Sequence, residues 1–370
     1  MTKKKVVFLV GYFPIAPGGA ELQSYQIANE LKSTHDIYFI SIDDSISKMT
    51  KKYENGFTVY LLPKNKLSRR LFTHNEFVNY YKVKHILNEI KPDILYQRCA
   101  CYNTWIACKL KDKYNYKFIY HCASDLEVKP LELRYGIKGL FNRLERFIVR
   151  KSLRKADCIY VQNSFQFDKL RSIYPSQNIK IVYNFSYPPQ STCEKSYDHI
   201  KVMWVANVKP IKNPECYLQI VRKFAEVRNI TFYMIGGEGS PQLMNEIKAL
   251  MNEQENFMYL GRLHNSEINL MLEEAHLLVN TSLNEGFSNV FVQSWFRGVQ
   301  VLSLNSDPDN LISHYDLGII ANGDQSRIVD YLKDFINGGD ERIDVAIKIM
   351  EFAHSTLSNN AVIPRIAQDF

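Results

Sequence analysis

The sequence predicts an α/β protein with two Rossmann-like lobes, each built on a doubly wound parallel sheet. Three observations support this fold class: a length of 370 residues, an alternation of short apolar runs with helix-length amphipathic segments, and a proline-containing break near the middle. A chain of this length exceeds what one hydrophobic core usually spans, so two domains are expected. The 46% apolar and 23% charged residues are those of an ordinary folded globule.

The first half of the chain alternates between strand-like and helix-like segments. The expected strands are Val6–Val10, Ile37–Ile42, Phe57–Leu62, Asp93–Tyr96, Lys117–His121, Cys158–Gln162 and Ile179–Tyr183. The expected helices are Ala20–Leu31, Asn75–Glu89, Tyr102–Lys113, Gly139–Lys155 and Ser164–Ile173. This β-α-β alternation is typical of a parallel sheet that helices cover on both faces.

The alternation stops at Ser186–Ser191, where two prolines with serine and glutamine predict a linker. We therefore expect one lobe over residues 1–186 and a second over 187–357, with about 358–370 packing back on the first lobe. Strands of the second lobe are expected at Lys201–Ala206, Thr231–Ile235, Phe257–Leu260, Leu277–Val279 and Val299–Ser303, and helices at Glu341–Leu357 and Ala361–Phe370. Two such lobes predict an interlobe ligand cleft at the carboxyl ends of the strands.

Targeting and redox features of the sequence predict a cytoplasmic protein. The apolar run after Met1–Lys5 is too short for a signal-peptide core. No window approaches about 18 uninterrupted apolar residues, so no transmembrane helix is expected. The seven cysteines include no Cys-x-x-Cys pair, which favours reduced thiols over disulfides or a metal site.

A glycine-containing loop follows the first expected strand. Gly18 and Gly19 let the backbone approach a ligand, and the helix after them points free amides toward negative charge. The loop therefore predicts a phosphate site; the alternative is a plain turn with Glu21 as a first-turn acid. Asp43 and Asp44 stand where the ribose-binding acid of a nicotinamide site would be, but the glycine spacing is not Gly-x-Gly-x-x-Gly, so that site is the weaker alternative.

Two loops of the second lobe carry charged residues after expected strands. Lys209 and Lys212 suit a diphosphate whose leaving charge must be offset, with solvated surface lysines as the alternative. Glu285 follows a later strand, and Ser288 is expected to cap the next helix. A carboxylate beside exposed helix amides suits a sugar hydroxyl next to a phosphate, with a helix-dipole acid that binds no ligand as the alternative.

This acidic loop resembles a known signature. Glu285-Gly286-Phe287, with Gln293 eight residues after the acid, resembles the Glu-x7-Glu motif of family-4 retaining glycosyltransferases, which have the GT-B fold. Further segments follow in the family's order: Gly18-Gly19-Ala20-Glu21, Tyr120-His121, Asn207 to Lys212, Gly236-Gly237-Glu238-Gly239 and Gly261-Arg262-Leu263. Each segment is modest alone, but the ordered set is specific and covers nearly the whole chain.

The resemblance implies a role for each matching position. His121 would face the transferred sugar, Lys212 would neutralise the diphosphate and Glu285 would hold the donor sugar; these are the implied catalytic residues. The implied donor-binding residues are Gly18, Gly19, Asn207, Lys209, Gly261, Arg262, Gly286, Phe287, Ser288, Asn289, Val290 and Gln293. Within this set, position 293 would bond the nucleotide ribose, and the loop at Gly261 and Arg262 would flank the base.

Two positions depart from the family pattern. Asn207 stands where arginine is usual, and Gln293 stands where the second glutamate is usual. The first change removes a positive charge from the diphosphate site, for which Lys209 is a candidate replacement. The second leaves an amide carbonyl that still accepts from a ribose hydroxyl, without the strengthening that a charge supplies.

Metal chemistry is the alternative to the metal-independent reaction that the family implies. Asp307-Pro308-Asp309 has the spacing of the paired acids that hold manganese in the other major glycosyltransferase fold. Asp307 as a helix cap with Pro308 in the first turn explains the same residues locally, so no metal site is expected.

A strongly basic segment lies between residues 134 and 155. Its cations are Arg134, Lys138, Arg143, Arg146, Arg150, Lys151, Arg154 and Lys155, against the single acid Glu145. Leu140, Phe141, Leu144, Phe147 and Ile148 recur at helical spacing and form an apolar stripe. A basic amphipathic helix predicts an anionic membrane surface as partner, through Arg143, Arg146, Arg150, Lys151 and Arg154; a core-packed helix with a solvated cationic face is the alternative. Nucleic acid is a weaker option because no recognition motif accompanies the charge.

These inferences combine into one expected function. The chain is expected to be a metal-independent, retaining glycosyltransferase of hexosyltransferase type that needs no cofactor and uses a nucleotide-diphosphate sugar, with a UDP-sugar favoured. The expected acceptor is a glycan or a lipid-linked acceptor in bacterial-type surface polysaccharide synthesis, reached from the inner face of the cell membrane. The alternatives are a sugar-nucleotide epimerase or hydrolase on the same fold, or a catalytically degenerate member that binds a glycan or a partner.

Overall fold

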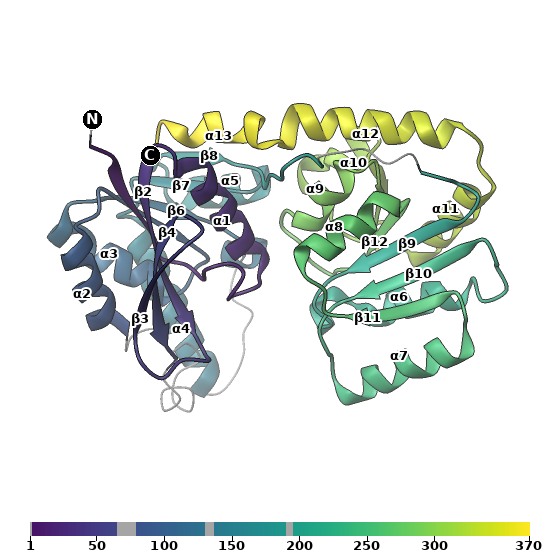
Figure 1. Ribbon diagram of the computed structural model, residues 1–370, viewed down its shortest axis with the longest axis horizontal. Helices are drawn as coiled ribbons and strands as arrows, with labels where there is room; N and C mark the ends of the chain where they lie inside the picture. The colour runs from purple at the N-terminus through teal and green to yellow at the C-terminus, as the bar shows by residue number, and fades with distance from the viewer. Residues whose placement is uncertain (1, 65–78, 130–136, 190–194) are drawn as a thin grey trace. The chain divides into compact units, whose positions relative to one another are not determined.

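The computed structural model describes residues 2–64, 79–129, 137–189 and 195–370. The chain forms two compact units (Figure 1): unit 1 comprises Met1–Tyr183 and Val362–Phe370, and unit 2 comprises Asn184–Ala361. Each unit is built on its own sheet, in which nearly all neighbouring strands are parallel. The predicted fold class, two Rossmann-like α/β lobes, is confirmed.

Unit 1 contains an eight-stranded sheet with the order β3-β4-β2-β1-β5-β6-β7-β8. Its strands are β1 (Lys4–Phe8), β2 (His35–Asp43), β3 (Thr50–Glu54), β4 (Phe57–Pro63), β5 (Ile94–Arg98), β6 (Lys117–His121), β7 (Cys158–Val161) and β8 (Ile179–Ile181). Its helices before the linker are α1 (Gly19–Leu31), α2 (Tyr80–Ile90), α3 (Tyr102–Tyr114), α4 (Ile137–Leu153) and α5 (Ser164–Ile173). β3 pairs antiparallel with β4, whereas β1 lies between the parallel strands β2 and β5.

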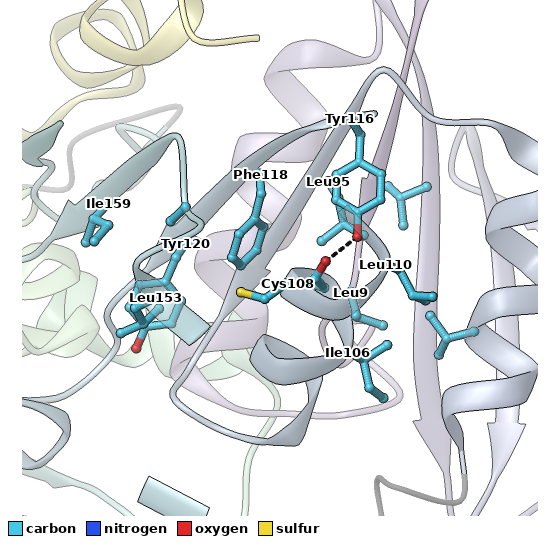
Figure 2. Packing of buried hydrophobic residues seen from close by; sticks show 14 of the residues in the cluster. Leu9, Leu95, Ile106, Cys108, Leu110, Tyr116, Phe118, Tyr120, Leu153 and Ile159 are labelled. Atoms are coloured by element: carbon cyan, nitrogen blue, oxygen red, sulfur yellow. Dashed lines mark hydrogen bonds between the residues drawn. The ribbon is translucent and has the colours of Figure 1, made fainter. Parts of the chain in front are cut away.

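Helices α2 to α5 contribute to one buried apolar cluster on the sheet of unit 1. Ile106 from α3 packs in this cluster with strand residues such as Leu95 and Phe118 (Figure 2). The Tyr116 hydroxyl donates a hydrogen bond to the backbone carbonyl of Ala107 inside the cluster, so this buried polar group has a partner. Removal of apolar surface from water, worth roughly 25 cal/mol per Å², is what holds these helices on the sheet.

Aromatic rings also pack around the middle strands of unit 1. Phe8 of β1 lies 5.1 Å from Phe39 of β2 and 4.9 Å from Tyr96 of β5, measured between ring centroids. The last residue of the chain, Phe370, stacks on Phe8 at 6.5 Å with the two rings 8° from parallel. The C-terminus is therefore part of the core of unit 1.

The return to unit 1 runs through α12 (Glu341–Leu357) and α13 (Asn359–Ala367). Beyond α13, the buried carboxylate of Asp369 accepts hydrogen bonds from Tyr160 at 2.8 Å and from Lys180 at 2.7 Å. Lys117 approaches the other carboxylate oxygen at 3.2 Å. These contacts join β6, β7 and β8 to the chain terminus.

Unit 2 contains a six-stranded sheet with the order β11-β10-β9-β12-β13-β14. Its strands are β9 (Ile200–Val205), β10 (Ile230–Ile235), β11 (Phe257–Gly261), β12 (Leu277–Asn280), β13 (Gln300–Ser303) and β14 (Gly318–Ile320). The helices are α6 (Pro214–Arg222), α7 (Pro241–Glu253), α8 (Asn265–Glu274), α9 (Asn289–Trp295), α10 (Leu311–His314) and α11 (Gln325–Asn337), together with α12. Helices α6, α7 and α11 share one buried cluster with the sheet, and β9 lies between β10 and β12.

The expected strands and helices that fall in the described residues are present, with ends shifted by a few residues. The structure adds β3, which is an edge strand of mainly polar residues, and the short β14. Neither carries a long enough apolar alternation to be predicted. The start of the helix expected at Asn75 lies in 65–78, outside the described residues.

The unit boundaries differ from the expected ones by a few residues. The units change at Asn184 and the chain returns to unit 1 at Val362, against the expected 187 and about 358. Part of the expected linker is paired, because Ser186 forms an isolated β-bridge with Ser358. Gln190 and Ser191 of that linker lie outside the described residues.

Two further expectations concern membrane spans and thiols. Among the described helices, none combines the length and apolar character needed to cross a bilayer. The cysteines in the described ranges are free thiols.

Replacing Asp369 should destabilise the fold. Burial raises the pKa of Asp369, but hydrogen bonds from Lys180, Tyr160 and Lys117 outweigh burial and hold this pKa below its ordinary value of 3.8. The ionised carboxylate therefore stabilises the fold at pH values above 3.8, and this contribution is lost as the pH falls through the lower folded-state pKa. Asp369→Asn should cost about 2 kcal/mol of unfolding free energy at pH 7, measured by urea denaturation, and progressively less in acid.

The exposed carboxylate of Asp112, paired with Lys155, provides the matched control. Asp112→Asn should leave the urea midpoint near that of the parent, because exposed ion pairs contribute little. Equal midpoints for Asp369→Asn and the parent at pH 7 would contradict the role given to Asp369.

Candidate functional site

The chain connectivity of unit 2 brings two loops together at one edge of its sheet. β9 has β10 on one side and β12 on the other, so the strand order reverses at β9. Ligands of open parallel sheets bind at the carboxyl ends of the strands where such a reversal occurs. The segments that leave β9 and β12 at this edge contain Lys212 and Glu285.

Lys212 and Glu285 form an ion pair at this edge. Lys212 ends the 3-10 helix η4 (Pro210–Lys212), and α6 begins shortly after it at Pro214. The Lys212 side chain is 23% exposed and that of Glu285 is 17% exposed. A cation and a carboxylate are therefore held together where solvent, or a ligand, still reaches both.

A buried threonine connects the segment of Lys212 to the sheet. The Thr281 hydroxyl, directly after β12, donates to the backbone carbonyl of Lys212 at 2.9 Å and accepts from the indole N–H of Trp204 at 2.9 Å. The backbone N–H of Leu283 donates to the carbonyl of Ile211 at 2.9 Å. Thr281 thus donates one hydrogen bond and accepts another, and so holds the loops after β9 and β12 together.

The loop from Gly286 to Val290 leads into α9. Ser288 occupies the N-cap position of α9, but its side chain makes no capping hydrogen bond, so the expected capping role of Ser288 is wrong. Instead the Asn184 amide donates to the backbone carbonyl of Phe287 at 2.6 Å and to the side-chain carbonyl of Asn289 at 2.8 Å. Phe287 and Val290 are buried, which anchors the loop through apolar packing.

Gln293 lies inside α9 and is 5% exposed. Its amide donates to the side-chain carbonyl of Asn265, the first residue of α8, at 2.7 Å. The carbonyl oxygen of Gln293 is the atom that the family resemblance assigns to a ribose hydroxyl. That role stays a prediction.

A glycine-rich turn after β10 lies beside the Gly261–Arg262 loop. The backbone N–H of Gly236 donates to the carbonyl of Gly261 at 2.8 Å, and a Cβ at Gly236 would lie 2.0 Å from the carbonyl oxygen of Ala206. Only glycine allows this approach of β9 and β10 at the site. Arg262 is exposed and lies against Gly237.

Two further predicted donor residues, Asn207 and Lys209, lie in the loop after β9 and are both exposed. The backbone N–H of Lys209 donates to the carbonyl of Asn207 at 2.8 Å, which closes a tight turn. Lys209 therefore lies within the same short loop as Lys212. This proximity is consistent with Lys209 as the replacement for the arginine that position 207 lacks.

In unit 1, Gly18 and Gly19 stand at the start of α1, as predicted from the glycine loop. The Glu21 side chain folds back over Gly18, where a Cβ would lie 2.1 Å from a carboxylate oxygen of Glu21. The pKa of Glu21 is raised by burial, against the lowering effects of its own backbone N–H and of Arg98. A carboxylate of the chain thus occupies the amide end of α1, as the first-turn alternative describes.

His121 ends β6 and is 1% exposed. Its Nδ1 lies 2.8 Å from the Tyr96 hydroxyl and 3.4 Å from Nη1 of Arg98, both from the neighbouring strand β5. Burial, and then the charge of Arg98, lower the pKa of His121 well below its ordinary value. The ring is therefore neutral at physiological pH.

The acids of the alternative metal and nicotinamide sites form hydrogen bonds or ion pairs with other groups of the chain. Asp307 accepts from the backbone N–H groups of Ile312 at 2.8 Å and Ser313 at 3.2 Å, so it caps the start of α10. Asp43 accepts from Ser45, and Asp44 pairs with Lys64 at 2.6 Å. Within the described part of the chain, no three metal-ligating side chains lie together.

The basic segment forms α4, as predicted, and two residues of its apolar stripe are exposed. Leu144 is 51% exposed and Phe147 is 64% exposed, whereas Val149 and Leu153 are buried. Arg134 and the side chains of 137–142 lie outside what the structure describes. Of the predicted cations, Arg150 donates to the backbone carbonyl of Lys129 at 3.0 Å. Leu144 and Phe147 of the stripe therefore face solvent, while Val149 and Leu153 attach the same helix to the core.

Sequence reasoning missed the residues that position the predicted ones. Thr281, Tyr96 and Arg98 match no motif and are brought to the sites by strand pairing. The signal available was modest: Arg98 and Thr281 are polar residues at, or just after, the end of an apolar strand. At the ends of parallel strands such residues are candidates for a site.

Comparison with known proteins identifies the two halves separately. Residues 17–185 match the model described as Glycosyltransferase Family 4, and residues 199–337 match the model described as Glycosyl transferases group 1. An uncharacterised 41.2 kDa protein in the cps region of Klebsiella pneumoniae is 26% identical over 241 residues, which are 61% of this chain and 63% of that protein. One component of human phosphatidylinositol N-acetylglucosaminyltransferase is 24% identical over 152 residues, 39% of this chain and 31% of that protein. Each match thus spans less than two thirds of the relative's own length.

Solved structures resemble the chain over almost its whole length. Sucrose-phosphate synthase from Thermosynechococcus elongatus has a TM-score of 0.80 at 13% identity, covering 99% of this chain and 98% of that one. Anabaena HepE in complex with UDP-glucose has a TM-score of 0.71 at 14% identity, and WaaG, a glycosyltransferase involved in lipopolysaccharide biosynthesis, one of 0.74 at 15%. Each of these two covers 99% of both chains.

The fold of the two units and the two matching models define a glycosyltransferase with the GT-B fold. Within this class, the chain belongs to glycosyltransferase family 4. The family resemblance of the Glu285 loop is thereby confirmed.

Removing the Thr281 hydroxyl tests the connection between the two loops of unit 2. Thr281→Val keeps the shape but leaves the Trp204 indole N–H and the Lys212 carbonyl without their partner, so unfolding free energy should fall by about 2 kcal/mol. Urea denaturation followed by tryptophan fluorescence measures this loss. The control is Thr231→Val, because the hydroxyl of Thr231 bonds His199 in an exposed position; equal losses in both variants would contradict the role of Thr281.

Proposed function

We propose that this protein is a retaining, metal-independent glycosyltransferase of hexosyltransferase type. It transfers a sugar from a nucleotide-diphosphate donor to a glycan or a lipid-linked acceptor, in the synthesis of a bacterial-type surface polysaccharide. The observation that carries this proposal is the Lys212–Glu285 ion pair at the switch point of the unit 2 sheet. Retention and independence of a metal rest on the family resemblance.

The ion pair suits the charge changes of glycosyl transfer. As the bond from the sugar to the diphosphate breaks, negative charge grows on the leaving oxygen, and a fixed cation there lowers the barrier. Lys212 is the proposed cation, with Lys209 as a second. Glu285 balances Lys212 before the donor binds and, once the diphosphate takes its place at the lysine, accepts hydrogen bonds from sugar hydroxyls.

We assign the remaining donor contacts to the loops around this pair. Gly286, Ser288 and Asn289 contribute backbone groups at the start of α9. Gln293 accepts from the ribose, and the Gly261–Arg262 loop flanks the base. A UDP-sugar is the proposed donor, a choice supported by the complex of the structurally similar HepE with UDP-glucose.

The acceptor proposal draws on the names of similar proteins. The Klebsiella relative is described as a protein of the cps region, and WaaG as involved in lipopolysaccharide biosynthesis. The human relative is named for a phosphatidylinositol acceptor. These names support an acceptor that is a growing surface glycan on a lipid; its use at the cytoplasmic face of the membrane is part of the same proposal.

Replacing Lys212 is the direct test of the proposed reaction. Lys212→Ala should lower turnover by about 100-fold or more, which is the cost of removing one stabilising group from a developing oxyanion. The assay is UDP release from a panel of UDP-sugars, in the presence of lipid-linked glycans extracted from bacterial membranes. The control is Lys201→Ala: Lys201 lies near the start of β9, at the opposite edge of the sheet, and pairs with Glu274.

Several outcomes of this assay would contradict the proposal. Near-parental turnover of Lys212→Ala would remove the lysine from the mechanism. UDP release that needs no acceptor and yields free sugar would indicate a hydrolase. Activity abolished by a chelator and restored by manganese would contradict the metal-independent reaction.

We further propose that α4 binds the anionic surface of the membrane. Leu144 and Phe147 are more than half exposed on a helix whose described cations include Arg143 and Lys151. Exposed apolar side chains next to cations are the pattern of helices that lie in the membrane interface. Each well-placed cation contributes roughly 1 kcal/mol toward an anionic bilayer.

A cavity beside these residues supports the same partner. It lies between α3 and α4, has a volume of about 460 Å³ and is lined by Trp105, Cys108, Lys109, Phe147, Ile148, Lys151, Ser152 and Lys155. Its lining combines aromatic and aliphatic groups with three lysines and no acid. An anionic lipid headgroup with the upper part of its acyl chain has matching chemistry.

Vesicle flotation tests the membrane proposal. The parent protein should float with phosphatidylcholine vesicles that contain phosphatidylglycerol and not with phosphatidylcholine alone. Leu144→Ser with Phe147→Ser, and separately Lys151→Glu, should each reduce the bound fraction roughly tenfold. The control is Leu270→Ser, because Leu270 is equally exposed, at 63%, but belongs to α8, which carries Glu267 and Glu273. Unchanged flotation of both α4 variants would rule out α4 as the membrane contact.

A further inference from the structure

Strand pairing in unit 1 aligns three polar side chains around one histidine. In the register of the sheet, Arg98 of β5 lies opposite His121 of β6, and His121 lies opposite Tyr160 of β7. Side chains at paired positions point to the same face of a sheet, and so do residues two apart on one strand. Tyr96 therefore joins Arg98, His121 and Tyr160 on one face.

The His121 ring is held rigidly among these neighbours. It meets the ring of Tyr96 edge-on, with centroids 5.9 Å apart and planes at 89°, and the ring of Tyr160 at 5.5 Å and 90°. Arg98 is 2% exposed and Tyr96 is fully buried. The ring has no room to change its orientation without disturbing the core.

The contacts at Nδ1 determine which ring nitrogen carries the proton. The Tyr96 hydroxyl lies 2.8 Å from Nδ1, and the Arg98 guanidinium lies 3.4 Å from it. A guanidinium group only donates hydrogen bonds, so Nδ1 is the acceptor in the contact with Arg98 and the proton of the neutral imidazole belongs on Nε2. The Tyr96 hydroxyl, which also contacts Ser24 and Arg98, then donates its one proton to Nδ1.

The charges around the ring favour its neutral form. Burial and the positive charge of Arg98 both lower the pKa of His121, in that order. Burial raises the pKa values of Tyr96 and Tyr160, so both phenols stay protonated. Glu21 of α1 interacts electrostatically with Arg98. A second positive charge on His121 is thus opposed by burial and by Arg98.

The other ring nitrogen is left without a partner. Nε2 of His121 is fully buried, and no group in the described residues forms a hydrogen bond with it. A buried N–H donor without an acceptor is unusual in native proteins, and a ligand atom that accepts from it is one explanation.

We propose that Tyr96 and Arg98 are positioning residues that hold His121 as the neutral Nε2–H tautomer, so that Nε2 donates a hydrogen bond to an oxygen atom of a bound sugar. The sugar as ligand rests on the proposed function; the tautomer does not. In this arrangement His121 does not act as a base, because its one lone pair at Nδ1 is already engaged. Its contribution is a directed donor in a buried setting, where hydrogen bonds are strong.

Nitrogen NMR of the full-length protein tests the tautomer directly. Long-range ¹H–¹⁵N correlation spectra of imidazole-labelled protein, with His121 assigned through His121→Gln, report which ring nitrogen carries the proton. The parent should show a neutral ring with the proton on Nε2, unchanged as the pH is lowered through the ordinary histidine value of 6.5. Tyr96→Phe removes only the hydroxyl and should shift His121 toward a mixture of tautomers. A proton on Nδ1 in the parent, or an unchanged tautomer in Tyr96→Phe, would overturn the positioning role.

The ligand part of the proposal has its own readouts. Titration of the parent with UDP-glucose, UDP-galactose and UDP-N-acetylglucosamine should move the Nε2–H resonance for the sugar that is bound. Nε2 protonated in the free protein but unmoved by every one of these sugars and by a lipid-linked glycan extract would overturn the sugar contact, with the tautomer assignment intact. Loss of the proposed glycosyltransferase activity in every assay would leave the tautomer result unchanged, so the two failures are distinguishable.

Two amide substitutions give a kinetic test. The glutamine amide of His121→Gln reaches the position of Nε2 and keeps a donor there, whereas the shorter amide of His121→Asn reaches only the position of Nδ1. His121→Gln should retain kcat within about tenfold of the parent, and His121→Asn should lose about 100-fold, the cost of one directed donor. Equal losses in the two variants, with both folded by circular dichroism, would overturn the role of Nε2 as a donor.

Discussion

The reversal of strand order at β9 is the constraint on which the site of unit 2 depends. Because all strands of this sheet run parallel, every loop that leaves a strand at its carboxyl end lies at the same edge. The loops after β9 and β12 are joined there by the hydrogen bond from the Thr281 hydroxyl to the carbonyl of Lys212. Lys212 and Glu285, which are 73 residues apart in sequence, meet there as an ion pair. A cation held beside a carboxylate, partly open to solvent, is suited to exchange its partner for a diphosphate.

Buried polar contacts make this edge rigid. Thr281 links the indole of Trp204 to the carbonyl of Lys212, and Asn184 links the start of unit 2 to the loop before α9. Buried polar contacts also surround His121 in unit 1, where Tyr96 and Arg98 of the adjacent strand contact one ring nitrogen. In each unit, the residues proposed to meet a ligand are oriented by neighbours that are themselves fully buried. Preorganised polar groups of this kind stabilise a transition state without reorganising during the reaction.

The surface of unit 1 carries a separate feature with a different physical basis. Helix α4 is attached to the core through Val149 and Leu153, while Leu144 and Phe147 stay exposed beside cations and a cavity of about 460 Å³. Exposed apolar groups have a cost in water that a bilayer interface removes. The proposed donor site at the strand ends and the proposed membrane contact of α4 would together let one chain use a water-soluble donor and a lipid-borne acceptor.

The sequence by itself determined the α/β alternation, nearly all of the strands, and the position of the charged loops. It did so because buried parallel strands and amphipathic helices have distinct apolar periods, and because the glycosyltransferase signature is local to short segments such as Glu285–Gln293. Only the tertiary structure decided which residues hold the candidate site residues in place. Thr281, Tyr96 and Arg98 are set by strand register, the Glu21 carboxylate lies against Gly18, and the Ser288 side chain does not cap α9. Helical periodicity reports that one face of α4 is apolar, but not what covers that face. The sequence therefore could not show whether the stripe on α4 faces the core or the solvent.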